Sequence, residues 1–127
     1  MGVAGIPTAF IAEWGSGRPI IGYLGEFDAL TGVSQEISPV RKPRVQGGPG
    51  HGCGHNLLGT AALGAALGLK HVLSETNTSG TVRYYGCPAE ELLAGKVYMA
   101  RAGVFDDLDV AITWHSGDIN SVRLRSG

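Results

Sequence analysis

The pattern of apolar and polar positions predicts four strands and two helices along the chain. Residues 6–14 and 19–24 are β-branched and aromatic runs separated by Gly15, Ser16, Gly17 and Arg18, a pattern typical of two strands joined by a short turn. Residues 81–85 (TVRYY) form a third strand by propensity, and residues 109–114 form a fourth.

The helical segments lie between these strands. Residues 57–73 are rich in Ala and Leu and apolar nearly all round, so we expect a helix packed on both sides, against a sheet and a further element. Residues 92–102 predict a second helix that ends at Gly103 as its C-terminal cap. The order strand, strand, helix, strand, helix, strand indicates an α/β domain, with a layered mixed sheet and flanking helices.

Residues 31–50 show no sustained periodicity and contain several prolines and glycines. A loop of this length inside a compact domain is usually functional, and this one leads directly to the run HGCGHN at residues 51–56. Arg41, Lys42 and Arg44 lie within the loop, and we interpret them as a solvated charged surface.

The composition of the chain indicates which kinds of partner and which cellular compartment to expect. A formal net charge of −1 over 127 residues gives no reason to expect nucleic acid or an anionic membrane as a partner. No apolar run approaches the roughly 20 residues of a membrane span, and the N-terminus has no signal-peptide pattern. Two distant cysteines, Cys53 and Cys87, do not form a disulfide framework. We therefore expect a soluble, cytoplasmic protein of at most one domain.

The run at residues 51–56 contains side chains that can bind a metal ion. Its glycines allow the backbone to fold tightly enough for Cys53 and His55 to converge, and thiolate and imidazole are ligands that zinc and its neighbours prefer. Asn56 suits the N-cap of the following helix, whose positive end favours a Cys53 thiolate. We interpret His51 as a loop residue and Cys87 as a small buried packing residue.

Further candidate ligands follow the other strands. Asp28 follows the second strand, Glu90 and Glu91 follow the third, and His115 ends the fourth. Sites of α/β proteins gather at the carboxyl ends of strands. Adjacent glutamates in an extended segment point in opposite directions, so one can bind metal while the other takes a proton from water. Thiolate, imidazole and carboxylate together exceed what one zinc ion normally uses, and we therefore consider a site of two metals with a shared ligand.

Four segments together resemble metallopeptidase family twenty (M20), the aminoacylase and amidohydrolase group. These are residues 25–30 (GEFDAL), 50–59 (GHGCGHNLLG), 88–91 (PAEE) and 113–115 (TWH), within a resemblance that covers about residues 6–115. The resemblance extends to a subgroup that hydrolyses p-aminobenzoyl-glutamate. It implies a zinc-peptidase-like catalytic domain that cleaves the amide between an acyl group and an amino acid, as in p-aminobenzoyl-glutamate or a dipeptide.

The resemblance also implies roles for individual residues. The implied metal ligands, with Cys53 bridging two ions, are Cys53, His55, Glu91 and His115. Glu90 would be the general base, and Asp28 would orient a ligand. The implied cofactors are two divalent ions, with zinc expected first and manganese, cobalt or nickel as alternatives. The implied partners are an N-acyl amino acid or dipeptide substrate and further subunits, in a homo-dimer or a hetero-oligomer.

Some features depart from the family pattern. Leu92 and Leu93 follow the paired glutamates where small residues are usual. Family members also contribute another histidine and a lid or dimerisation domain, so we expect this chain to be a partial catalytic domain that is a poor catalyst alone. Two alternatives stay open: Cys53 as a thiol nucleophile with a histidine partner, and a non-catalytic relative with at most a structural metal.

Overall fold

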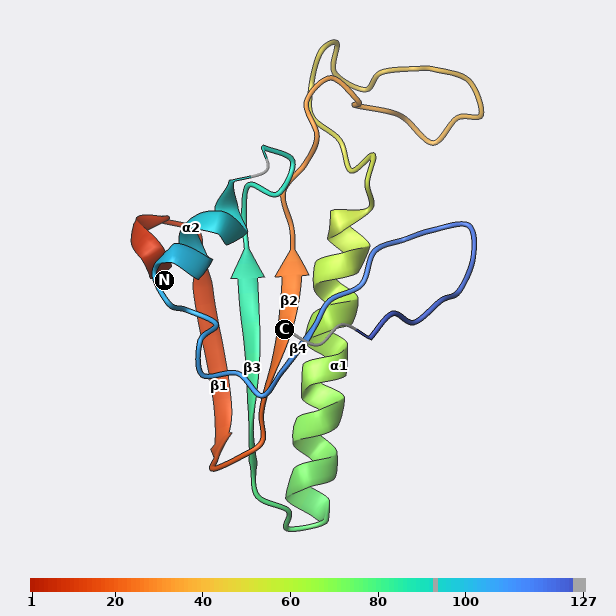
Figure 1. Ribbon diagram of the computed structural model, residues 1–127. Coiled ribbons are helices and arrows are strands. Elements are labelled where there is room, and N and C mark those ends of the chain that lie inside the picture. The colour runs from red at the N-terminus through yellow and green to blue at the C-terminus, as the bar shows by residue number, and fades with distance from the viewer. Residues whose placement is uncertain (93, 125–127) are drawn as a thin grey trace.

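The computed structural model describes residues 1–92 and 94–124, and within them four strands form one mixed sheet (Figure 1). The strands are β1 (Phe10–Ser16), β2 (Ile20–Glu26), β3 (Gly80–Cys87) and β4 (Val110–Ile112), in the order β1-β3-β2-β4. β2, β3 and β4 run parallel to one another, and β1 is antiparallel to β3. The predicted α/β class with a mixed sheet is confirmed.

The first two strands are not paired with each other, although only a short turn joins them. β3 inserts between them, with Ser16 opposite Gly80 in one ladder and Ile20 opposite Thr81 in the other. The turn crosses the start of β3, where the Thr81 hydroxyl donates to the Gly17 carbonyl at 2.8 Å and the Thr81 N–H donates to the Pro19 carbonyl at 2.9 Å. Strand propensity therefore predicted the two segments as strands, but it did not predict that each of them pairs with β3.

Two strand boundaries differ from the prediction. The chain starts with a short 3₁₀ turn, η1 (Val3–Gly5), and the partly buried Ile6 packs against a core cluster, so β1 begins only at Phe10. At the other edge, β4 has three residues because it pairs with β2 only from Val110 to Ile112. The chain has already left the ladder when it reaches His115.

Helix α1 (His55–Glu75) packs on one face of the sheet. Ala62 and Ala66 form a core cluster with Tyr23, Val82 and Tyr84 of the strands. The outer face of α1, which includes Leu57 and Leu67, is exposed within the part of the chain that the structure describes. The expectation that both sides are packed is therefore wrong for these residues, because the apolar pattern extends beyond the face that the sheet covers.

By length and composition alone, α1 could also cross a membrane, which corrects the expectation that no apolar run is long enough. Core helices of soluble proteins satisfy the same criterion. We assign α1 to the domain core because its buried face contacts β2 and β3, and because its first residue, His55, lies among charged side chains.

Helix α2 (Gly95–Arg101) lies on the opposite face of the sheet, where Met99 packs with Ala9, Tyr85 and Cys87. Side chains alternate along β3, so consecutive residues of this strand contribute to the two different cores. The helix starts at Gly95 rather than at residue 92, because residues 90–92 form a turn; Leu93 lies outside the described residues. Gly103, with φ of 71°, follows the last turn of α2 and confirms the predicted helix end.

The carboxyl ends of the parallel strands lie at the end of the domain where α1 begins (Figure 1). The loop between β2 and α1 projects from this end and contains neither a helix nor a strand from residue 31 to residue 49, as predicted. The base of the loop is closed by Leu30 and Gly50, whose backbone groups exchange two hydrogen bonds of 2.9 Å. This closure directs the chain into the segment that carries Cys53 and His55.

Candidate metal centre

His55 is the first residue of α1, and the residue before it determines how the helix starts. Gly54 has φ of 75°, in the left-handed region that glycine adopts without strain, and its carbonyl accepts the N–H groups of Leu57 at 2.9 Å and Leu58 at 3.0 Å. The N-cap residue is Gly54, and no side chain of the described residues caps this helix end, so the assignment of Asn56 as the N-cap is wrong. The left-handed turn at Gly54 starts the helix earlier and makes His55 its first residue.

Gly59 lets α1 approach the end of β2 closely. A Cβ atom at this position would lie 2.6 Å from the backbone oxygen of Glu26, and the Tyr84 hydroxyl donates to the Gly59 carbonyl at 3.1 Å. The side chain of His55, one turn earlier, is fully buried at this junction. The close contact of helix and strand thus brings His55 to the carboxyl end of β2.

Four carboxylates surround the His55 imidazole. On one side, Nε2 lies 3.2 Å from Glu26 Oε2 and 3.6 Å from Glu90 Oε2. On the other side, Nδ1 lies 3.4 Å from Asp28 Oδ1 and 3.8 Å from Glu91 Oε1. Nδ1 is also 3.1 Å from the backbone carbonyl of Asp28. With a proton on Nδ1 donated to that carbonyl, Nε2 presents its lone pair toward Glu26 and Glu90.

The paired glutamates occupy a turn rather than an extended segment. Ala89 has φ of 58°, and Glu90 and Glu91 follow it in the turn, so their side chains do not simply alternate. The backbone N–H of Glu91 donates to Asp28 Oδ2 at 3.0 Å. The two side chains therefore do not point in opposite directions from an extended backbone, as expected. Instead, the turn brings the Glu90 carboxylate to Nε2 of His55 and the Glu91 carboxylate to Nδ1 of the same ring.

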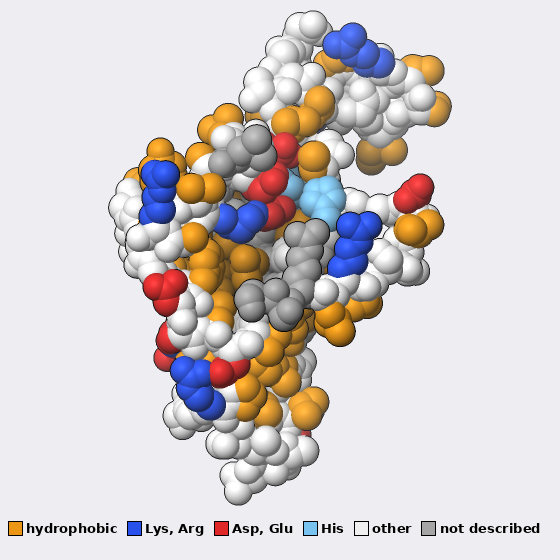
Figure 2. Space-filling model, viewed as in Figure 1, with side chains coloured by type: hydrophobic (Ala, Val, Ile, Leu, Met, Phe, Trp, Pro, Cys, Tyr) orange, Lys and Arg blue, Asp and Glu red, His pale blue; other side chains and the backbone are white. Residues whose placement is uncertain are grey.

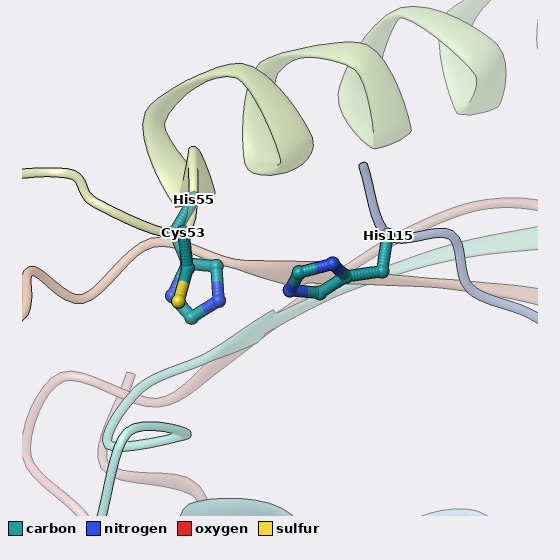
Figure 3. A group of neighbouring side chains, drawn as sticks. All are labelled: Cys53, His55 and His115. Carbon is teal, nitrogen blue, oxygen red and sulfur yellow. The ribbon is translucent and has the colours of Figure 1, made fainter. Parts of the chain in front are cut away.

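Cys53 and His115 complete the group (Figure 3). Cys53, His55 and His115 each offer a ligand atom within 4.8 Å of the other two, and the His115 ring lies edge-on to His55 with centroids 6.0 Å apart. Two hydrogen bonds hold the segment around His115 against α1: Trp114 Nε1 donates to the Leu58 carbonyl at 3.3 Å, and the Ser116 hydroxyl donates to the Cys53 carbonyl at 3.4 Å. Two parts of the chain that are far apart in the sequence thus meet at one point.

The Cys53 thiol is coupled to the carboxylates. Its hydrogen bond to Glu91 is the largest cause that raises the pKa of Cys53, followed by partial burial and by the negative charges of Glu91, Glu90 and Glu26. Without a cation, this environment favours the neutral thiol. Cys87, in contrast, is fully buried in the core as expected, and its burial raises the pKa of that thiol to about 11.

These residues fit divalent metal ions. Within residues 1–92 and 94–124, the buried side-chain atoms without a hydrogen-bond partner are Glu26 Oε2, Asp28 Oδ1 and His55 Nε2. Buried acceptors without a partner are unfavourable, and all three belong to this group. Figure 2 shows acidic side chains gathered around histidine on this face. Sulfur, nitrogen and oxygen donors together suit zinc and neighbouring transition metals.

The structure places every candidate from the sequence in this group, and it adds two residues that the sequence pattern did not single out. The predicted candidates that lie around His55 are Asp28, Cys53, Glu90, Glu91 and His115. The additions are Glu26, which a strand-end position two residues before Asp28 could have indicated, and Lys96 of α2, whose ammonium contacts Glu26 Oε1. His51 is exposed, and its backbone carbonyl accepts the Gly54 N–H at 3.2 Å.

No protein-family model matches the chain. Comparison with individual known proteins, however, gives relatives that are named as hydrolases or peptidases. The chain is 55% identical over 114 residues to one of the subunits of p-aminobenzoyl-glutamate hydrolase of Escherichia coli (strain K12), a match that covers 89% of the chain and 24% of that protein. It is 34% identical over 129 residues to Xaa-Arg dipeptidase of Mus musculus, covering 94% of the chain and 26% of the dipeptidase.

A solved structure agrees with these sequence matches. The YXEP protein of Bacillus subtilis, described as a dinuclear metal binding peptidase from the M20 family, matches with a TM-score of 0.59 and 29% identity, over 82% of this chain and 28% of that one. The resemblance to the M20 family is confirmed. These M20 relatives are hydrolases and peptidases of amide bonds by their names, and this chain spans about a quarter of their length.

Proposed function

We propose that this chain provides the metal site of an amide hydrolase that separates an acyl group from an amino acid, as in p-aminobenzoyl-glutamate or a dipeptide. The observation that carries the proposal is the convergence of Cys53, His115 and the carboxylates on buried His55, where three buried polar atoms have no partner among the described residues. The substrate class is proposed from the names of two M20 relatives. One relative is a subunit of p-aminobenzoyl-glutamate hydrolase, and the other is a dipeptidase.

In this proposal two divalent ions, with zinc preferred over manganese, cobalt or nickel, supply Lewis-acid polarisation of the amide and acidify water. The residues that would hold them are Cys53, His55, Glu91 and His115. His55 would bind through Nε2, because Nδ1 faces the Asp28 carbonyl at 3.1 Å. Asp28 would fix two of these ligands, since it also accepts the Glu91 N–H.

Glu90 would act as the general base and acid. It is the most exposed of the four carboxylates around His55, and its Oε2 lies on the Nε2 side of the ring. A carboxylate in this position can take a proton from water and pass it to the amine that leaves, while the other carboxylates hold metal or ligands. Glu90 itself lines a pocket of about 180 Å³ together with Gly95 and Lys96, and this opening supports the proposed role.

The alternative of a thiol nucleophile is disfavoured by electrostatics. A nucleophilic cysteine needs a pKa lowered by neighbouring positive charge, whereas the hydrogen bond to Glu91 and the surrounding carboxylates raise the pKa of Cys53. Both cysteines are free thiols, which supports a reducing, cytoplasmic location as part of the proposal. The Escherichia coli hydrolase is named as a protein of more than one subunit, which supports assembly with further subunits.

The test is an amide hydrolysis assay of the full-length protein loaded with zinc or manganese. We expect saturable release of the amino acid from p-aminobenzoyl-glutamate, N-acyl amino acids or dipeptides, with activity lost on chelation and restored by metal. Tight binding of metal without any hydrolysis would favour the non-catalytic relative. Hydrolysis that survives chelation but stops on alkylation of Cys53 would favour the thiol enzyme.

A further inference from the structure

Glu26 is the most deeply buried of the carboxylates around His55, with 8% of its side chain exposed. It is the last residue of β2, and side-chain alternation places it on the sheet face that α2 covers. There the ammonium of Lys96 contacts Oε1, while Oε2 lies 3.2 Å from His55 Nε2. One oxygen is thus fixed by a cation, and the other faces the imidazole.

Glu26 Oε2 and His55 Nε2 lie 3.2 Å apart without a recorded hydrogen bond between them. Both atoms are buried, and neither has a hydrogen-bond partner among the described residues. In the neutral ring whose Nδ1 donates to the Asp28 carbonyl, Nε2 carries a lone pair, so two electron-rich atoms face each other at 3.2 Å. Such a contact in a buried place is unfavourable unless a proton or a metal cation lies between the two atoms, and a metal ion also satisfies the other carboxylates around the ring.

The spacing of the two atoms is that of two ligands on one ion. Ligand atoms at about 2.1 Å from a tetrahedral zinc ion lie about 3.4 Å from one another. The 3.2 Å between Glu26 Oε2 and His55 Nε2 is close to this value, and Glu90 Oε2 lies 3.6 Å from the same nitrogen. Glu26, His55 and Glu90 all offer ligand atoms within 4.8 Å of one another.

We propose that Glu26 is a further metal ligand of this site, coordinating a divalent ion of the zinc group through Oε2 beside His55. Lys96 has a positioning role, because it occupies Oε1 and leaves one oxygen of Glu26 for the ion. Lys96 also offsets part of the negative charge that four carboxylates bring together. The inference rests on the metal site of the proposed function, and it adds a ligand to the set that the resemblance implies.

Glu26→Gln tests this role without removing the side chain. The amide oxygen of glutamine can still accept from Lys96, and its NH₂ group can donate to His55 Nε2, so the metal-free variant has satisfied partners. We expect zinc affinity, measured by competition with a chelating indicator, to fall at least about 10-fold. The Tm of the metal-free variant should equal or exceed that of the parent protein, while the rise in Tm on adding zinc should shrink. X-ray absorption should count one oxygen ligand fewer.

Glu13→Gln is the matched control. Glu13 pairs with Arg83 on the exposed side of β1 and has no contact with the site, so this change should leave zinc affinity and the zinc-induced rise in Tm unaltered. Unchanged zinc affinity in Glu26→Gln would overturn the inference. A lower metal-free Tm with an unchanged zinc-induced rise would do so as well, because that pattern belongs to a purely structural residue. If the parent protein binds no zinc, the proposed function itself fails together with the inference.

Discussion

Asp28 and Glu91 are joined by a hydrogen bond from the Glu91 N–H to Asp28 Oδ2 at 3.0 Å, although 63 residues separate them in the chain. The same aspartate faces His55 Nδ1 through its backbone carbonyl at 3.1 Å. One short segment after β2 therefore positions both the start of α1 and the turn after β3. This arrangement explains how groups on two different connections can meet at the carboxyl ends of the strands.

The first prediction concerns Asp28→Ala. Removal of this carboxylate leaves the Glu91 N–H without its acceptor and removes the charge beside His55 Nδ1. We expect zinc affinity to fall about 10- to 100-fold, the range for groups that orient metal ligands, as measured by chelator competition. Asp106→Ala, at an exposed position, is the control. Equal affinities for the two variants would show that Asp28 does not orient the site.

The second prediction separates the two neighbouring glutamates. Glu90→Gln should keep its metal content but lose about 10²- to 10⁴-fold in turnover, because general-base removal has costs of this size. Glu91→Gln should instead lose metal, since an amide replaces a proposed ligand. Metal analysis beside steady-state kinetics measures both effects. Two variants with full metal and comparable activity would contradict the assigned roles.

The third prediction concerns thiol labelling of the metal-free protein. The hydrogen bond to Glu91, partial burial and nearby carboxylates raise the pKa of Cys53, so less thiolate is present at neutral pH than for an ordinary cysteine. Labelling of Cys53 should be slow at pH 7, should accelerate as the pH rises, and should be blocked by zinc. Buried Cys87 should react only after unfolding. Rapid labelling of Cys53 at pH 7 would instead indicate an activated nucleophile.

The fourth prediction compares two glycines of α1. A Cβ at Gly59 would meet the Glu26 carbonyl oxygen at 2.6 Å, whereas a Cβ at Gly64 would meet no atom within 4 Å. Gly64→Ala should stabilise the fold by about 0.5–1 kcal/mol through helix propensity. Gly59→Ala should destabilise it by about 1–3 kcal/mol through overpacking and should weaken zinc binding. Urea unfolding measures both, and equal stabilities would contradict the close approach of α1 to β2.

The sequence predicted much of the candidate site because strand ends are visible in a pattern of residues. The apolar runs predicted the positions of β2 and β3. The polar residues just beyond these strands, Asp28, Glu90 and Glu91, were therefore expected together at the carboxyl ends of the strands. Parallel strands bring their carboxyl ends together whatever their order. For this reason the site residues could be grouped even though the pairing of β1 with β3 was not foreseen.

Other features depend on contacts that a local pattern does not contain. Glu26 reads as the polar end of a strand, and only the packing of α1 and α2 on opposite faces places it between His55 and Lys96. The start of α1 depended on the left-handed conformation of Gly54 rather than on the capping propensity of Asn56. The exposed leucines of α1 show that an apolar pattern does not state which partner covers it.

The most direct test of a metal-dependent hydrolase site is a crystal structure of the zinc-loaded protein, with the ions located by anomalous scattering at the zinc edge. We expect two zinc peaks, with Cys53 Sγ, His55 Nε2, Glu91 and His115 among their ligands at about 2.0–2.3 Å. Glu26 Oε2 should coordinate the ion that His55 binds. Zinc found only elsewhere on the protein, with His55 still surrounded by carboxylates alone, would contradict a metal-dependent site at this position.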